Sequence, residues 1–224
     1  MTTVRTAFDR QLKMLETDLL RLAELVETQL VEAIKALYTM DMIIAQRVHE
    51  FDAALNTLRY EIEERSYTLL ALQQPNSGDM RRIVGAVSIA TNLERMGDHA
   101  AGIARLVLRM NPEAVVINIP EFKDMTTLAT TNLRSAMLAL GNHDAPLARQ
   151  IVRSDNAIDA LHEHVYAMLI KTMIDNPTTV EMATMLLWVS HNVERFADRV
   201  CNICERIIYV VTGNLFEPRT DDMP

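Results

Sequence analysis

The chain has 224 residues, of which 49% are hydrophobic and 5% aromatic, with 6 glycines and 7 prolines. This apolar content suffices for a sizeable core, and the scarcity of aromatic residues and helix breakers favours helices over sheet. The formal net charge of −8 argues against a general affinity for DNA phosphates, so we expect no nucleic-acid partner.

Apolar residues recur every three or four positions along most of the chain, which predicts long helices. In chain order we expect them over residues 4–38, 41–72, 79–110, 121–140, 144–174 and 178–212. Small residues in the seam of the third helix, such as Gly97, would let neighbouring helices approach closely. The last helix begins at Thr178-x-x-Glu181, which has capping-box spacing, and ends before Gly213, a helix C-terminal signal.

Residues 111–120 form the best candidate linker between two halves. We predict a first three-helix bundle over residues 1–112, a second over 118–216, and a flexible tail over 217–224. Because short connections make successive helices antiparallel neighbours, the predicted fold class is all-α, with two tandem antiparallel three-helix bundles.

A heptapeptide occurs once in each half: Asn92-Leu-Glu-Arg-Met-Gly-Asp98 and Asn192-Val-Glu-Arg-Phe-Ala-Asp198. Upstream of each copy lie an aspartate at the head of an apolar stretch, Asp52 or Asp155, and then a proline break. Since the elements follow the same order twice, the sequence predicts that the two halves are related by internal duplication.

Each heptapeptide places two carboxylates one helical turn apart, Glu94 with Asp98 and Glu194 with Asp198. Like charges at this spacing repel by about 0.2–0.5 kcal/mol in an isolated helix. Because that repulsion is repeated at equivalent positions, we expect a cation to offset it.

Oxygen-bearing side chains on the preceding helix of each half would face these pairs if the helices pack antiparallel. Such side chains are Asp52 and Asn56 in the first half and Asp155 and Asp159, followed by His162, in the second. Carboxylate and amide oxygens suit hard or borderline cations. We therefore predict two sites for divalent or trivalent cations, with Fe, Mn, Mg and Zn as candidates. Their predicted ligands are Glu94, Asp98, Asp52, Glu194, Asp198, Asp155 and Asp159.

A solvated charged face is the alternative interpretation of these acids. Arg95 and Arg195 adjoin them and could form ion pairs with acids on a neighbouring helix. A histidine at such an edge, here His99, is more often a hydrogen-bonded bystander than a metal ligand.

The two acidic stripes also differ. In the second half Asn202 and Glu205 extend the stripe, whereas Gly102 and Arg105 stand at those positions in the first half. The two sites would therefore bind metal differently.

The two cysteines, Cys201 and Cys204, lie within one predicted helix, which favours core packing in a reducing cytosol over a redox or zinc role. The N-terminus has no signal-peptide core, and no apolar run approaches the roughly 18 residues of a membrane span. We therefore expect a soluble cytoplasmic protein.

With their acid pairs, Glu94-Arg-Met-Gly-Asp98-His99 and Glu194-Arg-Phe-Ala-Asp198 resemble the paired motifs of the PhoU family of phosphate-uptake regulators. The Gln73–Pro75 break and the closing segment 202–213 resemble it too, and the similarity runs from about Phe8 to Gly213. The resemblance implies a pair of three-helix bundles, usually dimeric, in a bacterial or archaeal cytoplasm.

The resemblance further implies a negative regulator of the phosphate-starvation response and of phosphate uptake. Such a protein couples the phosphate ABC transporter, through its ATPase subunit, to a sensor histidine kinase, and some members bind metal clusters at both motifs. Two positions depart from the family pattern: Gly102 replaces a common asparagine, and Arg199 replaces a common histidine.

Two other functions remain as alternatives. A di-iron carboxylate oxidase or storage bundle expects Glu-x-x-His on two helices, and here only Asp159-x-x-His162 comes near. A helical scaffold without metal is the other. Neither a glycine-rich phosphate loop nor a Ser/His/Asp arrangement is found in the sequence, so we expect a protein that is not an enzyme.

Overall fold

The computed structural model describes residues 2–72, 75–111, 118–153 and 156–215, and these ranges contain helices and no strand. The helices are α1 (Thr2–Thr39), α2 (Met42–Leu72), α3 (Ser77–Val107), α4 (Glu121–Asn142), α5 (Ala145–Arg153), α6 (Asn156–Asp175), the 3₁₀ turn η1 (Pro177–Thr179) and α7 (Val180–Thr212). None of the described helices is long and apolar enough to cross a membrane.

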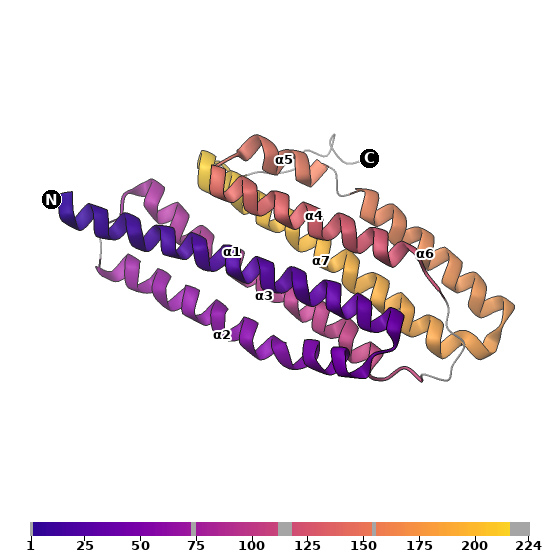
Figure 1. Ribbon diagram of the computed structural model, residues 1–224. Coiled ribbons are helices and arrows are strands. Elements are labelled where there is room, and N and C mark those ends of the chain that lie inside the picture. Colours follow the sequence, from indigo (N-terminus) through magenta and orange to yellow (C-terminus); the bar gives the residue numbers. More distant parts are fainter. Residues whose placement is uncertain (1, 73–74, 112–117, 154–155, 216–224) are drawn as a thin grey trace.

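The helices form two bundles that lie side by side (Figure 1). In the first bundle α1, α2 and α3 contact one another, and in the second α4, α5 and α6 all contact α7. The bundles meet where α3 packs against α7 and α1 packs against α4. This arrangement confirms the predicted all-α fold of tandem bundles.

The predicted apolar seams form the core. In α1 the residues spaced by threes and fours are at most 2% exposed: Leu12, Leu15, Leu19, Leu22, Val26 and Leu30. Burying each such side chain contributes about 1.5–3 kcal/mol relative to leaving it exposed. The helices are therefore held mainly by their apolar faces, as the periodicity predicts.

Two glycines of α3 allow neighbouring helices to approach closely. A Cβ at Gly97 would overlap Leu55 Cδ1 of α2, and a Cβ at Gly85 would overlap Val210 Cγ2 of α7. Both glycines are buried. The small residues of α3 therefore set its distance from α2 in the first bundle and from α7 in the second.

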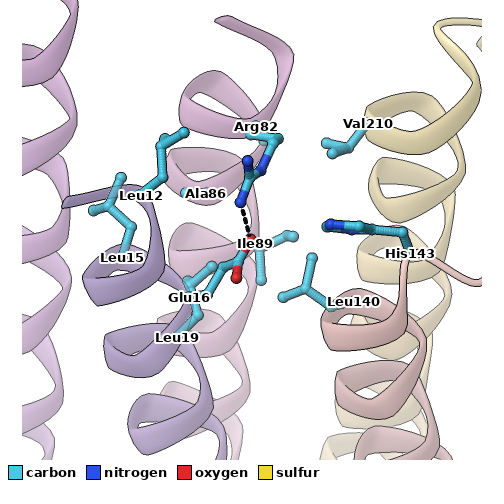
Figure 2. Close-up of a pocket in the computed structure, with 11 residues that line it drawn as sticks. Leu12, Leu15, Glu16, Leu19, Arg82, Ala86, Ile89, Leu140, His143 and Val210 are labelled. Atoms are coloured by element: carbon cyan, nitrogen blue, oxygen red, sulfur yellow. Dashed lines mark hydrogen bonds and ion pairs between the residues drawn. The ribbon is translucent and has the colours of Figure 1, made fainter. Parts of the chain in front are cut away.

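A small cavity lies where α1 and α3 meet the ends of α4 and α7 (Figure 2). There the Arg82 guanidinium donates to Glu16 Oε1 at 2.6 Å and ties α3 to α1. The cavity, of about 20 Å³, has room for roughly one water. The interface between the bundles is therefore closely packed at this end.

The start of α7 differs from the prediction, and its end agrees with it. The predicted capping box is wrong, because Thr178 lies in η1 and its hydroxyl donates to Asn176 Oδ1 at 2.7 Å. At the other end Gly213 has a φ of 77° and its N–H donates to Tyr209 O, which confirms the helix C-terminal signal.

The predicted helix over 144–174 is present as α5 and α6, which flank residues 154–155. Those two residues, most of the predicted linker and the tail 217–224 lie outside the described residues. At the start of α5, Asp144 Oδ1 accepts a hydrogen bond from the Leu147 N–H at 2.9 Å, next to Pro146 in the first turn. The domain boundaries stay a prediction.

The overlap at Gly97 predicts the effect of adding one methyl group. Relative to Gly141→Ala, Gly97→Ala should lower the free energy of unfolding by about 1–3 kcal/mol, the usual cost of overpacking a core. Gly141 is the control, because it also lies in a helix, α4, and a Cβ there meets no atom within 4 Å. Urea denaturation measures the difference, and equal stabilities would contradict the close α2–α3 contact.

Candidate functional site

Three carboxylates of the second bundle converge, and we call Asp159, Glu194 and Asp198 the second acidic cluster. Asp159 lies on α6, while Glu194 and Asp198 lie one turn apart on α7. One oxygen of each residue lies within 4.8 Å of the others, a spacing at which a single cation can contact all three.

The electrostatics of the second acidic cluster favour a bound cation. Burial raises the pKa of both Glu194 and Asp159, and the charge of Asp198 raises both further. Glu194 Oε2 is buried and finds no hydrogen-bond partner among the described residues, although His191 Nδ1 lies 3.4 Å away. The carboxylates therefore carry more negative charge than their surroundings compensate.

The first bundle places Asp52 of α2 beside Glu94 and Asp98 of α3, and we call these three the first acidic cluster. Burial raises the pKa of Glu94 and of Asp52, and in both cases Asp98 is the next cause. Glu94 is buried, and within the described ranges Asp52 Oδ1 has no hydrogen-bond partner. These three carboxylates interact, and they too could hold a cation.

The two clusters are unequal. Among the described residues only the second acidic cluster brings three ligand atoms within 4.8 Å of one another. In the first cluster Arg95 and Arg59 lower the pKa of Glu94, and Arg105 lowers that of Asp52. In the second cluster His191 and Arg195 lower the pKa of Glu194, so the first cluster differs by the additional guanidinium groups near it and by its wider ligand spacing, and it fits a cation less well.

Among the described residues, the motif arginines pair with acids of their own helices, and not across helices as in the alternative interpretation. Arg95 Nη1 lies 3.3 Å from Asp98 Oδ2, and Arg195 Nη1 lies 2.9 Å from Asp198 Oδ2, each on its own helix. The Arg95 side chain is 59% exposed. Such pairs are screened by water and salt and leave the acids' inner faces available.

The remaining predicted side chains take other positions. Asp155 lies outside the described residues. Asn56 turns its amide back to its own helix and donates to Asp52 O at 3.2 Å. His162 Nδ1 lies 2.8 Å from Ser190 Oγ, and His99 Nδ1 lies 3.2 Å from Asn192 Oδ1 on α7. Burial lowers the pKa of His99, so the structure places it as a hydrogen-bonded neutral group between α3 and α7.

Asn202 and Glu205 lie on α7 beyond the second acidic cluster. They line a polar cleft that faces Ser88 and Asn92 of α3. That these two residues extend the acidic stripe stays a prediction, since Glu205 follows Asp198 by about two turns and so keeps to the same face of α7.

His191 is a residue that the sequence reasoning missed. Its ring lies beside the second acidic cluster, 6.4 Å from the His162 ring and 5.7 Å from the Trp188 ring. It precedes Glu194 by three positions on α7, a spacing that the sequence could have revealed. It adds a nitrogen donor at the edge of an otherwise all-oxygen set.

The PhoU domain model matches residues 19–107 and 122–207. The chain belongs to the PhoU family. It is 35% identical over 214 residues to the phosphate-specific transport system accessory protein PhoU homolog of Streptococcus pneumoniae, covering 96% of this chain and 99% of the relative. Identity to the PhoU homolog of Clostridium acetobutylicum is 30%, over 93% of this chain and 96% of the relative.

Solved PhoU structures have the same fold. The phosphate transport system regulatory protein PhoU from Streptococcus pneumoniae aligns with a TM-score of 0.88 at 33% identity, over 94% of this chain and 99% of that one. PhoU from Pseudomonas aeruginosa aligns with a TM-score of 0.87 at 28% identity, over 92% and 100%. The two PhoU matches each contain one of the acidic clusters, in agreement with the predicted resemblance.

The raised pKa of Glu194 predicts how charge removal affects stability. A carboxyl whose pKa is higher in the folded state stabilises the fold when protonated, below the unfolded value of about 4.3, and loses that stabilisation as the pH rises through its folded pKa. In EDTA at pH 7, Glu194→Gln should therefore raise Tm, by about 1–3 °C for a chain of this size.

The gain from Glu194→Gln should shrink at pH 4, where both states bind the proton. The exposed Glu61 of α2 gives the matched control, and Glu61→Gln should leave Tm unchanged at both pH values. Thermal denaturation followed by circular dichroism measures the shifts. A lower Tm for Glu194→Gln at pH 7 would show that the carboxylate is already compensated within the fold.

Proposed function

We propose that this chain is an accessory regulator of a phosphate transport system, and that it acts in the cytoplasm by binding partner proteins without catalysing a reaction. One observation carries this proposal. The likeness of this chain to a protein named for phosphate-specific transport spans 96% of the chain and so includes both bundles. The fold also matches that of a PhoU described as regulatory, with a TM-score of 0.88. Similarity over the whole length supports a shared role better than a match to one bundle.

The proposed partners are the ATPase subunit of the phosphate ABC transporter and a phosphate-sensing histidine kinase. By coupling the two, a homodimer of this chain would negatively regulate the phosphate-starvation response and phosphate uptake. The duplication supports this arrangement, because two bundles of like fold offer two related surfaces, one for each partner.

We further propose that the second acidic cluster holds a divalent or trivalent cation, with Fe, Mn, Mg and Zn as candidates. The converging oxygens and the unpartnered Glu194 Oε2 support this assignment. Asp155 is proposed as a further ligand, and Asp52, Glu94 and Asp98 as a weaker second site. A bound cation would neutralise the carboxylates, and the residues that hold it would then tie α6 to α7.

The metal proposal predicts unequal losses on mutation. Glu194→Gln/Asp198→Asn should remove most of the metal that the wild type retains, because two of three converging carboxylates lose their charge. Glu94→Gln/Asp98→Asn should remove less, and Glu61→Gln none. Elemental analysis of protein purified without chelators and reconstituted with each cation gives the metal per chain.

The outcome of the metal analysis separates the alternatives. Wild-type protein that takes up no metal supports the scaffold without metal, while unchanged content in both double variants places the metal elsewhere. Oxygen consumption by the iron-loaded protein would instead favour the di-iron oxidase.

The regulatory proposal predicts direct binding and a matching response in cells. Immobilised full-length chain should capture the transporter ATPase subunit and the cytoplasmic part of the sensor kinase from the same organism. Deleting the gene should switch on a phosphate-starvation reporter in phosphate-rich medium, and the wild-type gene should restore repression. Binding to neither partner, together with an unchanged reporter, would overturn the proposed function.

A further inference from the structure

A polar cleft opens between α3 and α7, apart from both acidic clusters. Ser88 and Asn92 of α3 line one wall, and Arg199, Asn202, Glu205 and Arg206 of α7 line the other. Its volume of about 270 Å³ is ample for a small polyatomic ion. Two guanidinium groups face one carboxyl here, which makes the cleft locally positive on a chain with a net charge of −8.

The arginines of the cleft have hydrogen-bonding capacity to spare. Arg206 Nε donates to Ser88 Oγ at 3.1 Å, and its guanidinium lies 5.5 Å from the centre of the Tyr209 ring. These contacts orient Arg206 and leave its terminal nitrogens without a partner among the described residues. Arg199 Nε is buried and has no hydrogen-bond partner in the described part of the chain. Buried donors without partners cost stability, so a ligand that accepts from them is favoured.

The cleft lies beside Asn92 of the first motif, and the equivalent place beside Asn192 of the second motif differs. Asn92 donates to Ser88 O at 2.9 Å and Asn192 donates to Trp188 O at 2.7 Å, so both motif asparagines are anchored alike. On the Asn192 side the gap is closed, because His99 Nδ1 lies 3.2 Å from Asn192 Oδ1.

Gly102 also belongs to the closed side. A Cβ there would lie 2.9 Å from Asn192 Oδ1, so the absence of a side chain lets the asparagine fill the gap. On the open side the equivalent residues are Arg199 in place of His99 and Asn202 in place of Gly102. Two positions that differ between the halves, 199 and 202, therefore line the cleft with hydrogen-bond donors.

The carboxyl of Glu205 narrows the choice of anion. Burial raises its pKa and the adjacent Arg206 lowers it. A carboxylate in an anion site repels a fully deprotonated oxyanion such as sulfate, because sulfate has no hydrogen to donate to the carboxylate. At neutral pH phosphate carries one or two hydroxyl hydrogens, and one of them can be donated to the carboxylate.

We propose that this cleft binds inorganic phosphate, with Arg199 and Arg206 donating to its oxygens and Glu205 accepting its hydroxyl hydrogen. The choice of phosphate among protonated oxyanions rests in part on the proposed function, whereas the anion site rests on the cleft alone. A phosphate monoester shares the same chemistry but adds an organic group, so it is a separate arm of the test.

Isothermal titration of the full-length wild type with sodium phosphate, in EDTA and at constant ionic strength, tests the proposal. We expect saturable 1:1 binding of phosphate, binding of sulfate at least tenfold weaker, and weaker binding of glycerol phosphate. Arg199→Gln and Arg206→Gln should each reduce phosphate affinity at least tenfold. Glu205→Gln should reduce the preference for phosphate over sulfate.

Three controls accompany the titration. Arg109→Gln removes an exposed guanidinium from the turn that follows α3, outside the cleft, and it should bind phosphate like the wild type. Glu194→Gln/Asp198→Asn should also bind normally, which excludes phosphate held by residual metal. Far-UV circular dichroism confirms folding, and if an arginine variant unfolds, Asn202→Gly, which copies the closed half, should weaken binding instead.

The proposal is overturned if the wild type binds no phosphate at millimolar concentration, or if the arginine variants bind as well as the control. Equal binding of sulfate and phosphate would remove the role of Glu205 and leave a general anion site. Tighter binding of glycerol phosphate would assign the cleft to a phosphate monoester. None of these results bears on capture of the transporter and kinase partners, so the proposed function is tested separately.

Discussion

The close antiparallel contact between α3 and α7 is the constraint on which the rest of the molecule depends. Gly85 lies opposite Val210, and Gly102 lies opposite Asn192, so the missing side chains let the two helices meet. Since each helix also carries the acid pair of its own bundle, this contact fixes the separation of the two acidic clusters. It also forms both walls of the polar cleft. A displacement of α3 by the width of a methyl group would therefore change the geometry of both acidic clusters and of the polar cleft.

Repulsion between the carboxylates of each acidic cluster opposes this packing. The carboxylates of both clusters are partly removed from water and repel one another, which raises the pKa of Glu94 and Glu194 above the ordinary range. Such an arrangement lowers the stability of the fold unless a cation binds, and strain of this kind is typical of functional sites. Arg195 lies near the second cluster, whereas Arg59, Arg95 and Arg105 all lie near the first, so more guanidinium groups act on the first cluster.

Duplication gave the two halves the same framework, and small changes gave them different surfaces. In both halves the motif asparagine donates a hydrogen bond to the backbone carbonyl four residues earlier in its helix. At the neighbouring positions, His99 closes one side with a hydrogen bond to Asn192, while Arg199 lines an opening on the other. One ancestral position thus serves helix packing in one half and offers a buried donor in the other.

The sequence by itself determined the helices, the core and the acid pairs. Apolar spacing such as that of Leu12, Leu15 and Leu19 is a local property of a helix, and so is the one-turn separation of Glu194 and Asp198. Only the tertiary structure decided that Asp159 meets that pair, that Arg195 turns to its own helix, and that Asn202 and Glu205 face α3. These outcomes depend on the rotation and register of one helix against another, which many distant packing contacts set together and which no local pattern encodes.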